Sequence, residues 1–412
     1  MTVHVALLGP DLFPALAEFA RGLKSAGARV TGIGSTPEPK LRPGLRRHLD
    51  RWEQVPGSLT IESVVEAARR AGQPAALDRL EAVEERLVVL AAEARERLEM
   101  PGLSLRSARL CRDKPAMKDA LRQAGLPCAE SAAVASPREL GDFVDRVGLP
   151  LVLKPRAGLG SLRTYRVEST AELERAARQL ALPQGASVAV EEFVDGHEGI
   201  YDTISIDGTP RLEFIAHYYP PVLEAISNRR VAPQIAVSNR AERASYDELR
   251  AAGRRVIQAL GIDTSATHME WFFGSKGLKI SEIAARPAGE RIWDLYCVAD
   301  DLDLYREWGL AVSERGVEAR PSRRLATGHV QVRPDRDGIV VDVRGRELVE
   351  RRCGDFVFAR ELPRPGRRTV APEKGYLGNA WYRLRHPDYD ELRSLMDFVG
   401  RRLHIRARAA QR

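Results

Sequence analysis

The chain has 412 residues, of which 44% are hydrophobic and 29% charged, a composition that allows two or three folded domains and excludes a largely disordered protein. The net charge is +7, but the arginines are scattered and are not interleaved with aromatic residues, so we expect no nucleic-acid partner. Four widely spaced cysteines exclude a CxxC zinc site, and no apolar stretch approaches the ~20 residues that cross a membrane. With no signal-peptide pattern at the N-terminus, we expect a cytoplasmic protein without a membrane partner.

The first hundred residues predict a doubly wound α/β domain. An apolar run at Val3–Leu8 ends in a Gly-Pro pair, and a helical pattern and a second strand, Arg29–Ile33, follow. The glycines of the dinucleotide fingerprint are missing, so we assign no nucleotide binding to this part. Ile61–Met100 has helical spacing, with a strand-like run at Leu87–Leu90, and we expect it to complete a Rossmann-like domain over residues 1–107.

The middle of the chain alternates strands and helices, and its end is rich in strands. A stretch containing Arg, Ser and Pro at Arg315–Arg324 indicates a linker, so we expect a middle domain over residues 108–314 and a C-terminal subdomain over 315–412. Within the middle domain, a lid subdomain is expected at about 126–190. The predicted strands are Leu149–Lys154, Thr164–Val167, Ser187–Val194, Ile200–Ile206, Arg211–Ala216, His268–Phe273, Leu278–Ile283, His329–Val332, Ile339–Arg344 and Asp355–Ala359, and the predicted helices are Lys118–Gly125, Thr170–Leu180, Tyr246–Leu260 and Asp388–Leu403.

One of these strands ends in a lysine and is followed by a glycine-containing loop. Lys154 closes the apolar run, and Gly158, Gly160 and Ser161 come directly after it. Glycines allow backbone N–H groups to approach phosphate oxygens, and the lysine adds a positive charge. The pattern differs from a Walker A loop, and an ordinary β-turn is the alternative interpretation.

A second strand runs into carboxylates. Glu191 and Glu192 lie near the end of the strand at Ser187–Val194, and Glu198 follows the next turn. The edge of a strand offers backbone donors and acceptors to an adenine ring, and a glutamate beyond the turn can accept hydrogen bonds from ribose hydroxyls. For Glu191 and Glu192 a solvated strand end is the alternative.

A third pattern pairs two glutamates across a short turn. Glu270 and Glu282 are an even number of residues apart, so a hairpin with an odd number of loop residues places them directly opposite each other. Opposed carboxylates destabilise a hairpin unless a cation lies between them, and Mg²⁺ takes one or two carboxylates together with phosphate oxygens. A salt-bridged surface hairpin is the alternative, but the flanking residues are apolar. Four residues later, Arg286 can bind a phosphoryl or carboxylate group bidentately.

Taken together, the order and spacing of these motifs resemble the ATP-grasp superfamily, and within it the carboxylate–amine ligases typified by L-amino-acid ligases. The segment Arg112-Asp113-Lys114 and the helix at Met117–Ala124 resemble the entry into the family's ATP-binding half. The likeness spans about Ala108–Leu310 and, more loosely, the whole chain. It implies an ATP-grasp fold of mixed α/β and α+β class, with a Rossmann-like pre-ATP-grasp domain and a strand-rich C-terminal subdomain.

The resemblance also implies roles for the phosphate and metal sites. The expected cofactors are ATP and Mg²⁺, with Mn²⁺ as a substitute. Lys114 and Lys154 would contact the phosphates, Glu270 and Glu282 would ligate the metal, and Arg286 would stabilise an acyl phosphate. The loop expected to close over the triphosphate contains Gly158, Gly160 and Ser161.

For the nucleoside, the resemblance implies a site at the end of the second strand. Glu191 would accept from the adenine amino group beside Glu192, Phe193 and Val194 would offer backbone bonds to the ring, and Glu198 would hold the ribose. The expected reaction is ADP-forming ligation of a small carboxylate and an amine, both most simply amino acids. A homodimer is common in families of this kind.

One position departs from the family pattern. Ala284 stands where the family usually has an asparagine, two residues after the second metal-binding glutamate. One metal ligand is therefore lost, which keeps a non-catalytic ATP-binding protein open as an alternative. An ATP-grasp carboxylase that uses bicarbonate and a kinase that stops at phosphate transfer also stay open.

The substrate side of the site is less determined. His268 shares a strand face with Glu270, which makes it a candidate base for the amine, and a structural histidine is the alternative. The segment His217–Arg230 is partly aromatic and basic, and we expect the acid substrate there, with an ordinary loop as the alternative. Its Arg229 and Arg230 would suit a substrate with an extra carboxylate, and the residues considered as pocket walls are Trp271 and Trp293.

Overall fold

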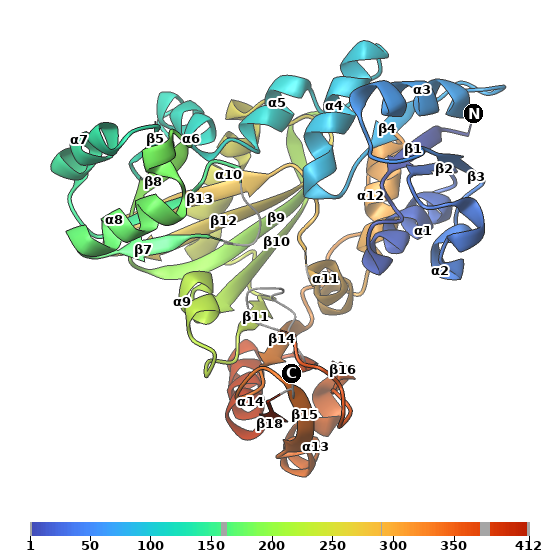
Figure 1. Ribbon diagram of the computed structural model, residues 1–412. Helices are drawn as coiled ribbons and strands as arrows, with labels where there is room; N and C mark the ends of the chain where they lie inside the picture. Colours follow the sequence, from blue (N-terminus) through green and yellow to red (C-terminus); the bar gives the residue numbers. More distant parts are fainter. Residues whose placement is uncertain (1, 158–162, 290, 371–379, 410–412) are drawn as a thin grey trace.

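The computed structural model describes residues 2–157, 163–289, 291–370 and 380–409. Figure 1 shows an N-terminal lobe, a lid lobe that carries α7 and α8, and a C-terminal lobe, arranged around the long strands of a central sheet. Among the described residues, no helix is both long enough and apolar enough to cross a membrane.

The N-terminal lobe is a parallel sheet with helices on it. Its strand order is β3-β2-β1-β4, and β1 pairs in parallel with both β2 and β4. This confirms the predicted strand–helix–strand opening. The elements are β1 (His4–Leu8), α1 (Ala17–Ser25), β2 (Arg29–Gly34), α2 (Pro43–Arg46), β3 (Arg51–Gln54), α3 (Ile61–Ala71), β4 (Arg79–Glu81) and α4 (Val88–Arg97).

The strand predicted at Leu87–Leu90 is wrong, because α4 begins inside that run. A short apolar run fits a buried strand and a buried helix equally well. Here Val88, Ala91 and Ala92 are buried at helical spacing, so the run supplies the inner face of a helix.

The lid lobe is a small antiparallel sheet covered by two helices. Its strand order is β5-β8-β6-β7, and Leu140 and Phe143 on α7 pack into its core. Ser136 caps α7 by accepting a hydrogen bond from the backbone N–H of Glu139, which fixes where the helix begins. The elements are β5 (Ser131–Val134), α7 (Pro137–Val147), β6 (Leu151–Pro155), β7 (Tyr165–Val167), α8 (Thr170–Gln179) and β8 (Val188–Glu192).

Among the described residues, the central sheet has eight strands in the order β13-β12-β9-β10-β11-β14-β17-β16. The stretch predicted as a linker, Arg315–Arg324, does not separate two sheets. Strands β14, β17 and β16 come after it in the chain and continue the same central sheet. The strands are β9 (His197–Ile206), β10 (Thr209–Tyr219), β11 (Gln234–Val237), β12 (Ser265–Gly274), β13 (Gly277–Ala284), β14 (Ala326–Val332), β16 (Val357–Glu361) and β17 (Ala380–His386). The remaining elements are α5 (Leu105–Leu110), α6 (Lys114–Gln123), α9 (Val222–Ser227), α10 (Asp247–Ala259), α11 (Ile292–Asp300), α12 (Leu304–Val312), β15 (Ile339–Arg344), α13 (Arg346–Cys353), α14 (Tyr389–Arg402) and β18 (His404–Arg408).

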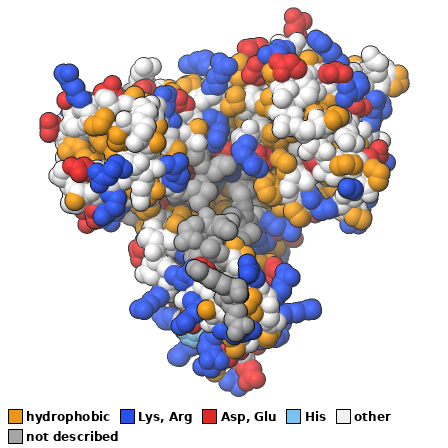
Figure 2. Space-filling view, viewed as in Figure 1, with side chains coloured by type: hydrophobic (Ala, Val, Ile, Leu, Met, Phe, Trp, Pro, Cys, Tyr) orange, Lys and Arg blue, Asp and Glu red, His pale blue; other side chains and the backbone are white. Residues whose placement is uncertain are grey.

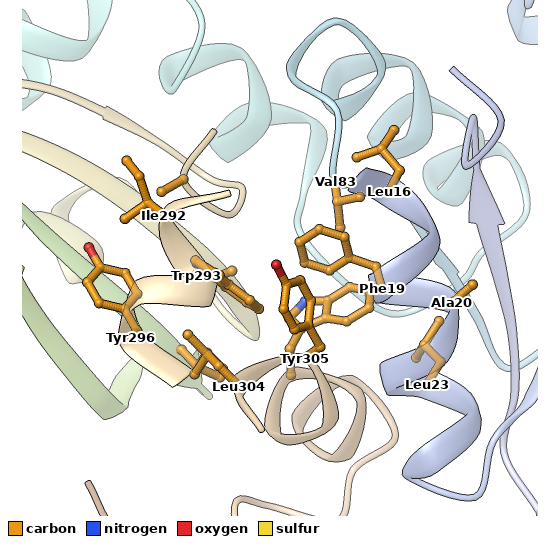
Figure 3. Close-up of a cluster of buried hydrophobic side chains, with 14 of the residues drawn as sticks. Leu16, Phe19, Ala20, Leu23, Val83, Ile292, Trp293, Tyr296, Leu304 and Tyr305 are labelled. Atoms are coloured by element: carbon orange, nitrogen blue, oxygen red, sulfur yellow. The ribbon is translucent and has the colours of Figure 1, made fainter. Parts of the chain in front are cut away.

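An aromatic cluster joins the N-terminal lobe to α11 and α12. Figure 3 shows Phe19 of α1 among Trp293 and Tyr305, with ring centroids 5.2 Å and 5.0 Å away. Arg21 adds a two-pronged ion pair to Asp303. Trp293 is only 2% exposed in this core, so its assignment as a wall of the substrate pocket is wrong.

The crossing of α1 and α12 depends on Gly22. A Cβ atom at Gly22 would lie 2.2 Å from the backbone oxygen of Tyr305, which no side-chain rotation can relieve. We expect Gly22→Ala to lower the free energy of unfolding by about 3 kcal/mol, although alanine is the better helix former. Urea denaturation measures this, with Gly141→Ala as the control, because Gly141 on α7 faces open space and should gain about 0.5–1 kcal/mol. Equal changes in the two variants would contradict the proposed close contact.

Candidate active site

A cavity of about 640 Å³ lies between the lid sheet and the central sheet. Strands β6 and β8 form its lid side, β12 and β13 form its floor, and α9 borders it. Its walls combine apolar side chains such as Val152 and Ile280 with charged ones. The residues assigned from the sequence to nucleotide or metal that line it are Lys114, Lys154, Glu191, Glu192, Phe193, Val194, Glu198, Glu270 and Glu282. Gly158, Gly160 and Ser161 lie outside the described residues.

Two buried lysines meet at Glu191. The Nζ atoms of Lys118 and Lys154 lie 2.7 Å and 2.9 Å from Glu191 Oε2. Burial alone would raise the pKa of Glu191, but the two lysines hold it below its ordinary value. Its other oxygen, Oε1, is buried and has no hydrogen-bond partner among the described residues. An unpartnered acceptor on a cavity wall fits the amino group of an adenine.

Lys118 was not identified as a site residue from the sequence. It lies four residues after Lys114 on α6, so both lysines project from one helix face. That spacing was the available signal. The partner Glu191 lies far along the chain on β8, and only the fold brings the two together.

The two predicted metal ligands are directly opposed in the β12–β13 hairpin. Glu270 pairs with Glu282, as expected, but the loop between Gly274 and Gly277 has two residues instead of an odd number. A β-bulge next to Glu270 supplies the missing residue, because Trp271 pairs with position 280. The opposition therefore comes from the bulge and not from the loop length.

The surroundings of the glutamate pair fit a divalent cation that also binds phosphates. Lys114 Nζ lies 3.1 Å from Glu282 Oε2, and despite burial the nearby lysines lower the pKa of Glu282 to about 2. Among the described residues, no group of three or more His, Cys, Asp or Glu side chains could hold a metal alone. Two carboxylates suit Mg²⁺, which takes its other ligands from phosphates and water. The expected third protein ligand is absent, since Ala284 stands opposite His268.

His268 is held in a polar chain beside this pair. Its Nδ1 lies 2.8 Å from Asp202, which also accepts from the hydroxyl of Tyr296, and its Nε2 lies 3.6 Å from Glu270. Burial lowers the pKa of His268, but the charge and hydrogen bond of Asp202 outweigh it and raise it to about 10. A protonated imidazole cannot accept a proton, so this state does not favour the base role suggested for His268. Asp202 was not identified from the sequence.

Arg286 is oriented by the N-terminal lobe. Its Nε donates to Glu85 at 2.5 Å and one terminal nitrogen donates to the Pro287 carbonyl at 2.6 Å. Arg112 makes a second ion pair with Glu85. Glu85 precedes α4 and is 201 residues from Arg286, so no local pattern could predict this contact.

The remaining predicted nucleotide residues have partners of their own. Glu192 is ion-paired with Lys276 in the hairpin loop, and the N–H of Phe193 donates to Pro150 at 3.2 Å, so that N–H is not free for an adenine. Glu198 accepts from the N–H of Val222 at 2.6 Å. Burial and the charge of Glu270 raise the pKa of Glu198 to about 8.

The segment predicted to hold the acid substrate contributes only in part. Its stretch from Pro221 to Glu224, together with Ser227, lines the cavity. Arg229 is ion-paired with Asp337 at 2.9 Å and so already has an anionic partner. Trp271 is buried on β12, facing His217.

Comparison with known proteins matches part of the chain to a protein family. Residues 119–297 match the family model of the ATP-grasp domain. The chain carries an ATP-grasp domain. The matched range contains both metal-ligand candidates and Arg286, whereas Lys114 and Lys118 of α6 lie just before it.

Sequence relatives cover parts of the chain. The alanine–anticapsin ligase of Bacillus subtilis is 24% identical over 305 residues, which is 61% of each chain. The carbamoyl phosphate synthase large chain of Rubrobacter xylanophilus is 25% identical over 340 residues, 78% of this chain and 30% of that one. The chain thus spans from about a third to three fifths of the length of such curated relatives.

Solved structures extend the likeness to the whole chain. The L-amino acid ligase from Bacillus licheniformis has a TM-score of 0.76 and 20% identity, covering 99% of both chains. The N5-carboxyaminoimidazole ribonucleotide synthetase from Thermotoga maritima has a TM-score of 0.67 and 16% identity, covering 99% of this chain and 100% of that one. The ATP-grasp fold, with its flanking N-terminal and C-terminal parts, is therefore confirmed.

Proposed function

We propose that the chain is an ADP-forming carboxylate–amine ligase that makes an amide or peptide bond through an acyl phosphate. The observation that carries the proposal is the opposed pair Glu270 and Glu282 on the wall of a cavity that also contains Lys114 and Lys154. Arg286 lies just beyond the pair on the same chain segment. The alanine–anticapsin ligase and the L-amino acid ligase support amino acids as the substrate class.

In the first step, a carboxylate oxygen of the acid attacks the γ-phosphorus of ATP, the bond from the β-phosphate oxygen to that phosphorus breaks, and ADP leaves. Bound Mg²⁺ supplies charge neutralisation for the phosphates, and Glu270 and Glu282 would hold it. Lys114 and Lys154 orient the phosphates by charge, and Arg286 neutralises the charge that develops on the transferred group.

In the second step, the amine attacks the acyl carbon, the bond from that carbon to the phosphate oxygen breaks, and phosphate leaves. The amine nitrogen gives up a proton during this step, and the leaving phosphate takes it up, so that the products are the amide and hydrogen phosphate. Glu85 accepts a hydrogen bond from Nε of Arg286 and so orients the guanidinium. A substrate supplies the nucleophile in each step, first the acid's carboxylate and then the amine, so no activated serine or cysteine is needed.

The test is ATP turnover with Mg²⁺ against a panel of L-amino acids, singly and in pairs, reading ADP and free phosphate together. We expect both products to rise only when an acid and an amine are present, and EDTA to abolish the rise. Bicarbonate-dependent product formation would instead favour a carboxylase, in keeping with the synthetase-like fold. ADP without free phosphate would indicate a kinase. Saturable ATP binding without turnover in any of these mixtures would refute a catalytic role.

A further inference from the structure

The lysine pair at Glu191 fixes the hydrogen-bonding character of one point on the cavity wall. Lys118 and Lys154 approach the same carboxylate oxygen, Oε2, at 2.7 Å and 2.9 Å. The other oxygen, Oε1, is buried and has no hydrogen-bond partner in the described part of the chain. A lysine ammonium offers donors and no acceptor. A polar side chain at position 191 must therefore turn an acceptor toward the lysines, which leaves its second polar atom for a ligand.

Glu191 lies on the face of the lid sheet that borders the cavity. It pairs with Val152 across β6 and β8, and directly paired residues share a face of a sheet. Both residues line the cavity, whereas Val190, the preceding residue on β8, packs into the core of the lid lobe. The Glu191 side chain therefore leaves the sheet on the cavity side, where a bound ligand can satisfy Oε1.

Lys118 differs from most basic side chains of the molecule in its burial. Figure 2 shows Lys and Arg side chains on the surface of all three lobes, where water solvates them. Lys118 is only 1% exposed, and among the described residues Glu191 is its single ion-pair partner. Lys154, in contrast, also lies 3.9 Å from Glu282 at the metal end of the cavity. A buried ammonium is costly unless it is paired, so a lysine that pairs with one carboxylate alone calls for a role at that carboxylate.

We propose that Lys118 is a positioning residue that sets the base selectivity of the cavity. Together with Lys154 it holds Oε2 of Glu191, so that only an acceptor faces the base and the cavity selects a purine with an exocyclic amino group. A purine without this group leaves Oε1 buried and unpaired, which costs affinity. This inference rests on the proposed function, because it assigns the base selectivity of the same nucleotide site.

Two nucleotides test this selectivity without any turnover. ADP and purine riboside diphosphate share the ring nitrogens, the ribose and the phosphates, and they differ only in the exocyclic amino group. Isothermal titration calorimetry of the full chain with Mg²⁺ gives the dissociation constant of each. We expect the unchanged protein to bind ADP about tenfold or more tightly than purine riboside diphosphate. Equal affinities would overturn the inference.

The variant Glu191→Gln tests whether the lysines control which atom faces the base. Its amide oxygen must turn toward the lysine donors, so its NH₂ group faces the base and meets the adenine amino group donor to donor. We expect the preference for ADP to disappear, with purine riboside diphosphate bound equally or more tightly. A glutamine variant that kept the preference of the unchanged protein would show that the lysines do not orient the amide.

A second substitution assigns this effect to Lys118. In Lys118→Met/Glu191→Gln, Lys154 can turn to Glu282, and the amide is then free to present its oxygen to the base. We expect the double variant to regain a preference for ADP of about threefold or more. A purely structural role of Lys118 would weaken the binding of both nucleotides alike, and a ratio equal to that of Glu191→Gln alone would therefore overturn the inference.

The matched control is Lys276→Met/Glu191→Gln. Lys276 pairs with Glu192, the next residue on β8, so this control should show the same ratio as Glu191→Gln alone. Should the glutamine variants fail to fold, Lys118→Met keeps the pair of Glu191 with Lys154. It is expected to weaken ADP binding about threefold or more and to leave the binding of purine riboside diphosphate unchanged. Unchanged ADP binding in that variant would contradict the role of Lys118.

The outcomes separate this inference from the proposed function. Absence of turnover with any acid and amine, together with the expected nucleotide preferences, would contradict the ligase and leave the role of Lys118 intact. Turnover without a preference between the two nucleotides would do the reverse. Binding of neither nucleotide would contradict both.

Discussion

Replacing Arg286 by methionine is expected to lower the rate of ADP and phosphate formation about a thousandfold. The guanidinium is the positive group that follows the Glu270–Glu282 pair, and Glu85 fixes its direction from the N-terminal lobe. A fixed cation stabilises charge that develops during phosphoryl transfer far more than charge in bound ATP. Steady-state turnover with the best amino-acid pair and direct ATP binding measure the two effects separately.

The control for this variant is Arg178→Met, which removes an exposed arginine whose neighbour Glu174 lies on the same lid helix. It should leave turnover within about twofold, because exposed ion pairs contribute little. ATP affinity of Arg286→Met should stay within about threefold of the unchanged protein. A parallel loss of ATP affinity and turnover would mean that Arg286 serves binding alone, and the assigned role in catalysis would then be wrong.

Replacing Glu191 by leucine is expected to lower the free energy of unfolding by about 3–5 kcal/mol. The change leaves Lys118 and Lys154 buried beside each other without the carboxylate that both contact. An unpaired buried charge is costly, and here two like charges face each other. Urea or thermal denaturation without nucleotide measures the loss.

A second substitution separates this charge effect from a loss of packing. Adding Lys118→Met to Glu191→Leu removes one of the stranded charges, and the double variant should recover part of the lost stability. Glu174→Leu on the exposed face of α8 is the control and should change stability by less than about 0.5 kcal/mol. If the double variant recovered no stability, the unpaired charge of Lys118 would not be the cause of the loss.

The sequence predicted the elements whose pattern is strong and local. The alternating apolar strands that became β6, β8, β12 and β13 were placed within a few residues, and so was the opening of the N-terminal lobe. The sequence was a poor guide to strands that are short or rich in arginine. Strands β11, β17 and β18 were missed. They are four to seven residues long and contain Gln or Arg, so their sequences do not look like strands, and pairing with neighbouring strands determines their conformation.

The candidate site divides in the same way. The residue types in order along the chain, from Lys114 and Lys154 to Glu270, Glu282 and Arg286, were sufficient to predict an ATP-grasp domain. The residues that contact these side chains were not predictable. In the sequence, Lys118, Asp202 and Glu85 look like ordinary helix, strand and loop residues.

The sequence by itself therefore determined the ATP-grasp domain and most of its central strands, since periodicity and local spacing fix strands and turns. Only the tertiary structure decided which charges meet. It joined Lys118 to Glu191 and Glu85 to Arg286, produced the bulge that opposes Glu270 and Glu282, and left Oε1 of Glu191 without a hydrogen-bond partner among the described residues. The physical reason is that pairing and burial depend on contacts between residues far apart in the chain, and those contacts set protonation, orientation and unmet hydrogen bonds.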